Sequence, residues 1–169
     1  NQIAFGLLRL YGSGSSFLPR GNVKVLQCAE FEEQMKCSTI ILTVGHSART
    51  LDEFIALLRA HAVTRVVDVR TVPRSRHNPQ FNKDSLPDSL SKAGLGYIHM
   101  PGLGGLRHAK NDSRNAGWRN ASFRGYADYM QTPEFEENLE RLIEVAKKDR
   151  IAIMCAEAVP WGCHRSLVG

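Results

Sequence analysis

The chain lacks any long hydrophobic run: no stretch approaches the ~20 consecutive apolar residues that a membrane-spanning helix requires, so we expect no contact with a membrane. Its first eleven residues also lack a basic leader followed by a small-residue cleavage site, and we therefore expect no signal peptide. Only four cysteines occur in 169 residues, and they lie far apart. This spacing argues against a disulfide framework and favours a reducing, cytoplasmic compartment. No internal repeat at a fixed period is present, which excludes solenoid architectures.

The composition, with 43% hydrophobic and 23% charged residues, is typical of a soluble globular domain. The formal net charge is +5, and fifteen of the 22 basic residues are arginines. Residues 45–131 carry thirteen basic and seven acidic side chains, so positive charge gathers in the middle of the chain. Because the guanidinium fork suits bidentate contacts to phosphate or carboxylate, this pattern favours an anionic partner, either a small molecule or a nucleic acid. A basic surface without a partner stays open as the alternative.

The ends of the chain differ from its middle. Residues 1–38 contain a linker-like Gly/Ser stretch at 12–16, and we interpret them as an appendage without an assigned function. Residues 39–169 are predicted to form one α/β domain. Since the chain stops a few residues after Cys163-His164-Arg165, we expect a truncation at the C-terminal end. The oligomeric state does not follow from the sequence.

Apolar runs and helical patterns alternate along the predicted domain. Apolar runs at 38–44, 63–69, 97–100 and 151–155 predict strands. Helical patterns at 50–58, 86–93 and 132–150 predict helices, whereas the segment 123–130 is predicted as a loop entering a helical turn. Thr50 and Glu53 have capping-box spacing, and Pro133 suits a first helical position. Alternating strands and helices predict a mainly parallel sheet with helices packed on it.

Each predicted strand runs into a cluster of polar residues. Because the carboxyl ends of parallel strands meet at one edge of a sheet, these clusters are expected to share one crevice. From the first strand to the last, and with Arg124 supplied by a loop, the residues are His46, Ser47, Asp68, Arg70, Ser75, Arg76, His99, Gly104, Gly105, Cys155, Glu157, Cys163, His164 and Arg165.

The triplet Cys163-His164-Arg165 suggests a reactive thiol. A thiolate is stabilised by neighbouring cationic groups and by a helix N-terminus, so the pKa of Cys163 is expected to be lowered. Glu157 is then the candidate acid or base. The alternative is that Cys163 is a small buried residue and His164 a surface side chain.

Cys155, Cys163 and His164 form a second candidate set, as ligands of a zinc or iron ion. A catalytic zinc takes three protein ligands and keeps one position open. The spacing fits no familiar zinc finger or ribbon, and adjacent Cys-His ligands are awkward for one ion. A buried and inert Cys155 stays open as the alternative.

Other patterns have both a chemical and a structural interpretation. Asp68 and Arg70 lie on one face of a strand, where they form an ion pair or, with Arg70 on a ligand, leave Asp68 as a catalytic base. Gly104-Gly105 offers backbone donors to an anion or simply turns the chain. Tyr126 contacts a substrate or packs in a helix face.

Taken together, these motifs resemble the domain-of-unknown-function 488 family over about residues 39–169. The quoted segments are Thr43-Val44-Gly45-His46-Ser47, Asp68-Val69-Arg70, Tyr97-Ile98-His99, Phe123-Arg124-Gly125-Tyr126, Met154-Cys155-Ala156-Glu157 and Cys163-His164-Arg165. The resemblance implies a small α/β domain whose pocket holds His46, Asp68, Arg70, Ser75, Arg124, Cys155, Glu157, Cys163, His164 and Arg165. It implies no activity.

Three functions follow as hypotheses. The first is a hydrolase or transferase for a phosphate-bearing nucleotide or nucleic acid, with Cys163, Glu157, Asp68 and His164 as catalytic residues. In it the substrate-binding residues are His46, Ser47, Arg70, Ser75, Arg76, Gly104, Gly105, Arg124, Tyr126 and Arg165. The second is a metal-binding or redox-sensing domain that uses Cys155, Cys163 and His164. The third is a non-catalytic nucleic-acid-binding module.

Overall fold

The computed structural model describes residues 6–9, 40–159 and 162–168. Cys28 and Cys37 lie outside the described residues, and the boundary at 38/39 stays a prediction. The described elements, in chain order, are β1 (Gly6–Arg9), β2 (Ile40–Gly45), α2 (Leu51–Ala60), β3 (Arg65–Asp68), η1 (Pro79–Phe81), α3 (Leu86–Lys92), β4 (Gly96–His99), η2 (Pro101–Leu103), α4 (Ala121–Tyr129), α5 (Pro133–Lys148), β5 (Ile151–Cys155) and α6 (Arg165–Val168).

The strands form one sheet in the order β1-β2-β5-β3-β4. The pairs β2–β5, β5–β3 and β3–β4 are parallel, whereas β1 pairs with β2 antiparallel at the edge. The predicted α/β class with a mainly parallel sheet is confirmed. The antiparallel edge strand comes from the segment that we interpreted as an appendage.

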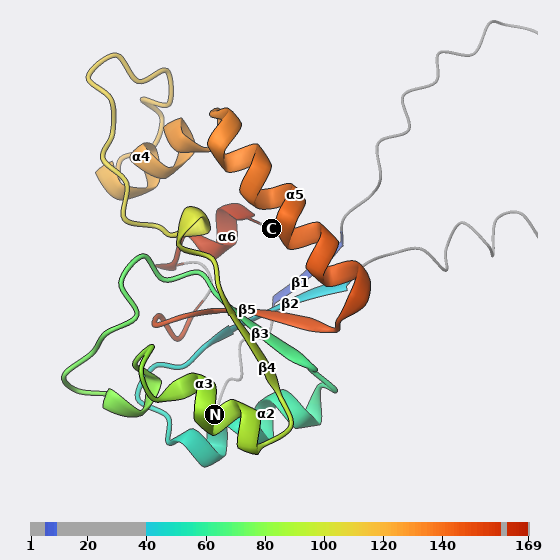
Figure 1. Cartoon of the computed structure of the whole chain (residues 1–169). Coiled ribbons are helices and arrows are strands. Elements are labelled where there is room, and N and C mark those ends of the chain that lie inside the picture. Colours follow the sequence, from blue (N-terminus) through green and yellow to red (C-terminus); the bar gives the residue numbers. More distant parts are fainter. Residues whose placement is uncertain (1–5, 10–39, 160–161, 169) are drawn as a thin grey trace, which may run out of the picture.

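Helices cover both faces of the sheet, with α2 and α3 on one side and α4, α5 and α6 on the other (Figure 1). Alternation along each strand explains the two layers, because successive side chains point to opposite faces. In β5, Ile151 and Ile153 pack in the core beneath α5, while Ala152 and Met154 pack in the core with α2 and α3.

The ends of the helices follow from local chemistry. Thr50 and Glu53 form the predicted capping box of α2. Thr132 caps α5, and Pro133 occupies its first turn. The segment predicted as a loop entering a helical turn is instead the helix α4, because the Asn120 side chain accepts from the backbone N–H groups of Ser122 and Phe123.

Along the described residues, we find no helix with the length and apolar character needed to cross a membrane.

Candidate active site

A cavity of about 560 Å³ lies at the carboxyl ends of the parallel strands. Ligands of open α/β sheets bind at this edge, because the loops that follow the strands converge there. Segments that follow β3, η2 and β5 contribute most of the lining, together with the start of α4. The lining residues are Arg70, Thr71, Val72, Gly105, Leu106, Asn120, Ser122, Phe123, Cys155, Ala156, Glu157, Gly162, Cys163 and His164.

A second hollow of about 410 Å³ adjoins the first, with which it shares Arg70, Val72 and Ala156. The loop after β2 and the loop after β3 form its other walls. These contribute His46, Ser47, Ala48, Arg74, Ser75 and Asn78. The crevice therefore extends along the ends of three adjacent strands.

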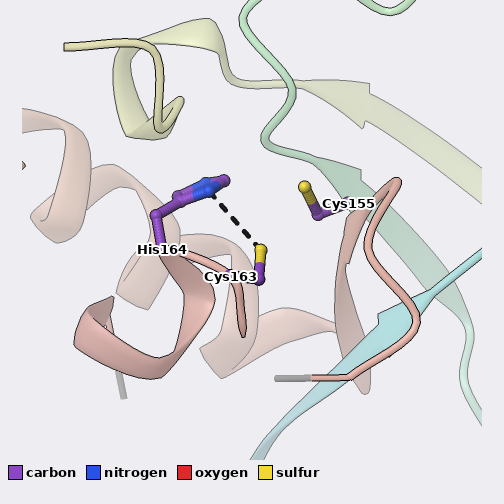
Figure 2. A group of neighbouring side chains, drawn as sticks. All are labelled: Cys155, Cys163 and His164. Atoms are coloured by element: carbon purple, nitrogen blue, oxygen red, sulfur yellow. Dashed lines mark hydrogen bonds between the residues drawn. The ribbon is translucent and has the colours of Figure 1, made fainter. Parts of the chain in front are cut away.

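Two cysteines and a histidine from separate elements meet in the larger cavity. Cys155 ends β5, whereas Cys163 and His164 precede α6. Their ligand atoms, the two Sγ and one ring nitrogen, all lie within 4.8 Å of one another. Figure 2 shows the three side chains grouped between the end of β5 and the start of α6, with a dashed line marking the contact of 3.5 Å between Cys163 Sγ and His164 Nδ1. Both cysteines are free thiols.

Three neighbours stabilise negative charge on Cys163 Sγ. A hydrogen bond from the Cys155 thiol is the largest cause that lowers the pKa of Cys163, and contacts with His164 and the backbone of Arg165 lower it further against the effect of burial. The Nε of Arg165 also donates to Sγ at 3.3 Å. The pKa of Cys155 is raised in turn, by its hydrogen bond to Cys163, by burial and by the neighbouring charge. Cys163 is therefore the thiolate of the pair and Cys155 its donor.

Some polar atoms near the two cysteines have no hydrogen-bond partner in the described part of the chain. The group that contains them, called here the thiol cluster, consists of Cys155, Cys163, His164 and Arg165. The Nη2 of Arg165 donates to the carbonyl oxygen of Glu157 at 2.6 Å. The Nη1 of Arg165 and the Nε2 of His164 are buried and have no hydrogen-bond partner among the described residues. Because buried polar groups are almost always paired, these two nitrogens leave hydrogen-bonding capacity that a bound water, ion or substrate can satisfy.

The His164 ring is held between a glycine and an aromatic side chain. A Cβ atom at Gly105 would lie 2.3 Å from His164 Nδ1, so only glycine allows this close approach. On the other side, the Tyr126 ring centroid lies 5.2 Å from that of His164. Tyr126 itself has no exposed surface, and its hydroxyl donates to the carbonyl oxygen of Leu103. The structure therefore places Tyr126 in the core behind His164, where it lines neither cavity.

Asp68, Arg70, His46 and Tyr97 form a second polar group, called here the closed network. The two carboxylate oxygens of Asp68 accept from Nε and Nη2 of Arg70 at 2.9 and 2.6 Å, and Tyr97 also donates to Asp68. The same Nη2 donates to the carbonyl oxygen of Phe81, and Nη1 lies 3.1 Å from His46 Nε2.

The closed network has consequences for two predicted roles. Asp68 is fully buried, is paired with Arg70 and does not line either cavity. Arg70 lines both cavities, but its charge is already matched by Asp68. The arrangement supports the structural ion pair over a catalytic base at Asp68 and a free cation at Arg70.

His46 is neutral in this arrangement. Its ring stacks on Phe81 at a centroid distance of 4.3 Å, and its Nδ1 lies 2.9 Å from the carbonyl oxygen of Ser47. Burial lowers the pKa of His46, and the neighbouring Arg70 adds to this effect. With Nδ1–H donating to Ser47, Nε2 accepts from Arg70, which is the pattern of the uncharged ring.

The remaining predicted residues fall into three groups. Glu157 is exposed and lines the larger cavity, and Ser47 and Ser75 line the smaller one. Gly104 packs against Thr71 and lines neither. Arg76 is exposed outside both cavities, and Arg124 is half-buried outside both, with its Nε unpaired among the described residues.

Several lining residues were missed from the sequence. They are apolar or small polar side chains in loops or at the start of α4: Thr71, Val72, Leu106, Asn120, Ser122 and Phe123. Residue type offered no signal for them, although Thr71 and Val72 follow directly after Arg70 and their place beside it was a usable clue.

Comparison with known proteins gives one match. The family model described as "Domain of unknown function DUF488" matches residues 50–169, which is most of the chain and bears out the resemblance seen in the motifs. No curated protein and no solved structure matches the chain.

Proposed function

The chain belongs to the family of domain of unknown function DUF488, and from the geometry of its cavity we propose an enzyme of hydrolase or transferase type for a phosphate-bearing nucleotide or nucleic-acid substrate. The observation that carries the proposal is the state of Cys163. Cys163 lines the cavity, its sulfur receives hydrogen bonds from Cys155 and Arg165, and the pKa of its thiol is lowered. A thiolate at the carboxyl edge of a parallel sheet is placed for nucleophilic attack on a bound substrate.

The reaction would proceed in two steps. The Sγ of Cys163 bonds to the electrophilic atom of the substrate as the bond to the leaving group breaks, and the leaving group takes a proton from the Glu157 carboxyl group. Water, or an acceptor hydroxyl group in a transferase, then displaces the sulfur and returns its proton to Glu157. Glu157 is suited to this role because it lines the same cavity. The cluster is compatible with attack at a glycosidic carbon or at phosphorus.

Charge supports an anionic substrate. Arg74 lines the smaller hollow, and the middle of the chain is rich in exposed arginines. Cationic side chains around a pocket raise the local concentration of an anion and hold its phosphate.

The test combines binding with turnover. Thermal-shift measurements with nucleotides, short oligonucleotides and inorganic phosphate find the ligand class, since a ligand of the native state raises the unfolding temperature. Product analysis and intact-mass detection of a covalent adduct then follow the reaction. We expect a Cys163→Ala variant to keep binding and to lose both adduct and turnover. Full turnover by that variant would end the proposal.

One observation favours a second candidate, a metal centre formed by Cys155, Cys163 and His164. A tetrahedral zinc ion about 2.3 Å from sulfur and about 2.05 Å from nitrogen separates those two ligand atoms by about 3.5 Å. The separation of Cys163 Sγ and His164 Nδ1 is 3.5 Å. Two thiolates and an imidazole suit zinc better than harder ions. When bound, such an ion would supply a Lewis acid beside the cavity.

Cys155 separates the two candidates. A Cys155→Ser variant keeps a donor to the Cys163 thiolate but removes one soft metal ligand. If the thiolate is the nucleophile, the variant keeps most of its turnover and the wild-type protein contains no stoichiometric metal. If the cluster is a metal centre, elemental analysis finds about one zinc or iron ion per chain, and the variant loses it together with activity. Oxidation of the two free thiols would favour the redox-sensing alternative.

A further inference from the structure

The exposed apolar surface of the described residues gathers beside the larger cavity. Its three large exposed hydrophobic side chains are Val72, Leu106 and Trp118, with exposed fractions of 65%, 69% and 41%. Val72 and Leu106 line the cavity directly. The Trp118 ring stacks on Phe123, another lining residue, at a centroid distance of 5.6 Å and an interplanar angle of 11°. Clustered exposed apolar groups beside a cavity indicate a binding surface.

The same segment is strongly basic. Residues 105–124 contain five basic side chains and one acidic side chain. Lys110, Arg114 and Arg119 are exposed and lie on both sides of Trp118 along the chain. Flat apolar groups interleaved with cations are the combination that binds single-stranded nucleic acid, because bases stack on the rings and phosphates pair with the cations.

The basic segment is held in place by a buried carboxylate. Asp128 on α4 accepts from the backbone N–H of Lys110 at 3.0 Å, from Ser113 Oγ at 2.6 Å and from Asn115 Nδ2 at 2.7 Å. These hydrogen bonds lower the pKa of Asp128, so the anchor stays ionised at neutral pH. A segment that is already ordered pays less conformational entropy when it binds a ligand.

We propose that residues 105–124, with Val72, form a surface for single-stranded nucleic acid, on which an unpaired base stacks at Trp118 while a neighbouring nucleotide enters the cavity toward Cys163. This deepens the proposed function, on which it rests, by naming the substrate class. A duplex hides its base faces in the stack and therefore does not satisfy the apolar part of the surface. The exposed cations outside the cavity exceed what a single mononucleotide needs.

Fluorescence anisotropy with labelled 12-mers tests the surface, with single-stranded DNA, single-stranded RNA and a duplex of the same sequence as probes. We expect one or both single strands to bind at least about tenfold more tightly than the duplex. A Trp118→Ala variant should weaken single-strand binding roughly tenfold or more, and Trp118→Phe, which keeps a flat ring, should restore most of it. Unfolding temperatures of both variants check that they fold.

Charge is tested with a matched pair of double variants. Arg114→Ala with Arg119→Ala should weaken binding to all single strands and reduce the slope of log affinity against log salt by about 1.4. The control, Arg141→Ala with Lys148→Ala, removes two exposed cations from α5, which contributes no residue to the cavity, and should leave binding unchanged.

Three results would contradict the proposed binding surface. They are equal affinity for the single strand and the duplex, unchanged binding by a folded Trp118→Ala variant, and equal losses of affinity in the two double variants. Its failure differs from failure of the enzyme proposal. If the wild-type protein binds single strands without any turnover, the binding surface is supported and the enzyme proposal fails. If it turns over mononucleotides without binding single strands, the enzyme proposal is supported and the binding surface fails. Selective capture of a protein instead of oligonucleotides would also count against the surface.

Discussion

The two polar groups that border the crevice are built in opposite ways. In the closed network, every buried side-chain nitrogen and oxygen of Asp68, Arg70 and His46 has a partner. In the thiol cluster, two of the buried nitrogens, His164 Nε2 and Arg165 Nη1, have none among the described residues. Both groups contain an arginine, a histidine and an anionic partner, so the difference lies in how completely they are satisfied.

This difference indicates that the closed network stabilises the fold and that the thiol cluster reacts with or binds a ligand. A fully satisfied buried network stabilises one arrangement and has no capacity left for a ligand. An incompletely satisfied cluster pays a desolvation penalty that a bound substrate or ion can relieve. Changes in the closed network should therefore affect stability, and changes in the thiol cluster should affect reactivity.

The largest effect is expected from Cys163. Replacing it with alanine should lower turnover on the order of 10³-fold or more, because the attacking atom is removed. The free energy of unfolding should change by only about 1 kcal/mol, since the lost side chain is small. Steady-state rates and urea unfolding on the same preparation measure both. A large loss of stability with intact turnover would reverse the assignment of the two groups.

The second largest effect is expected from replacing Asp68, and it concerns the stability of the fold. Asp68→Ala leaves the Arg70 guanidinium buried without its counter-charge and should lower the free energy of unfolding by about 3–5 kcal/mol. Urea denaturation measures it. The control is Glu144→Ala, which removes an exposed ion pair with Lys147 and should leave the free energy of unfolding nearly unchanged, because solvent screens such a pair. Equal changes in both variants would show that the closed network is not a stabilising scaffold.

A glycine pair tests how His164 is positioned. Gly105→Ala places a methyl group 2.3 Å from His164 Nδ1, so the ring must leave its present position beside Cys163, and alkylation of Cys163 near neutral pH should slow. At Gly117 a new Cβ meets nothing within 4 Å, and Cys163 in Gly117→Ala should be alkylated at the wild-type rate. Rates of labelling by iodoacetamide compare the two. Identical rates would mean that His164 does not support the thiolate.

The smallest effect concerns pH and His46. Burial lowers the pKa of His46 below its ordinary value near 6.5, so the unfolded chain binds more protons than the folded one between those two pKa values. The stability contributed by the neutral ring is fully present above about pH 6.5 and is lost as the pH falls toward the folded pKa. The difference in unfolding free energy between wild type and His46→Gln should therefore shrink from about pH 7.5 to about pH 5.5. A constant difference would contradict a neutral His46.

Local patterns predicted much of the fold. The apolar run at 151–155 matches β5, and the capping box at Thr50 and Glu53 marks the start of α2, because these signals need only neighbouring residues. The helix α4 was predicted only as a loop entering a helical turn, since its cap at Asn120 is a single residue in a polar stretch. The strand β1 pairs across a long sequence separation, and no local pattern specifies that pairing.

The part of the candidate site that lies at or just after the strand ends was predictable from the sequence. Cys155, Glu157 and Cys163 line the cavity because they lie at the end of β5 or in the segment that follows it. Burial was not predictable: Asp68 and Tyr126 are polar residues that the tertiary structure encloses completely. The apolar rim at Val72, Leu106 and Phe123 was missed for the opposite reason, because apolar residues are usually core and their exposure depends on how distant loops meet.

The pH dependence of Cys163 alkylation tests most directly the claim that the thiol cluster is the reactive centre. Iodoacetamide labelling of chelator-treated protein, followed by peptide mass spectrometry, reports Cys163 and Cys155 separately. The lowered pKa of Cys163 predicts labelling that continues well below pH 7 while Cys155 stays unlabelled. A labelling midpoint for Cys163 at about 8.5, the value of an ordinary thiol, would contradict the account.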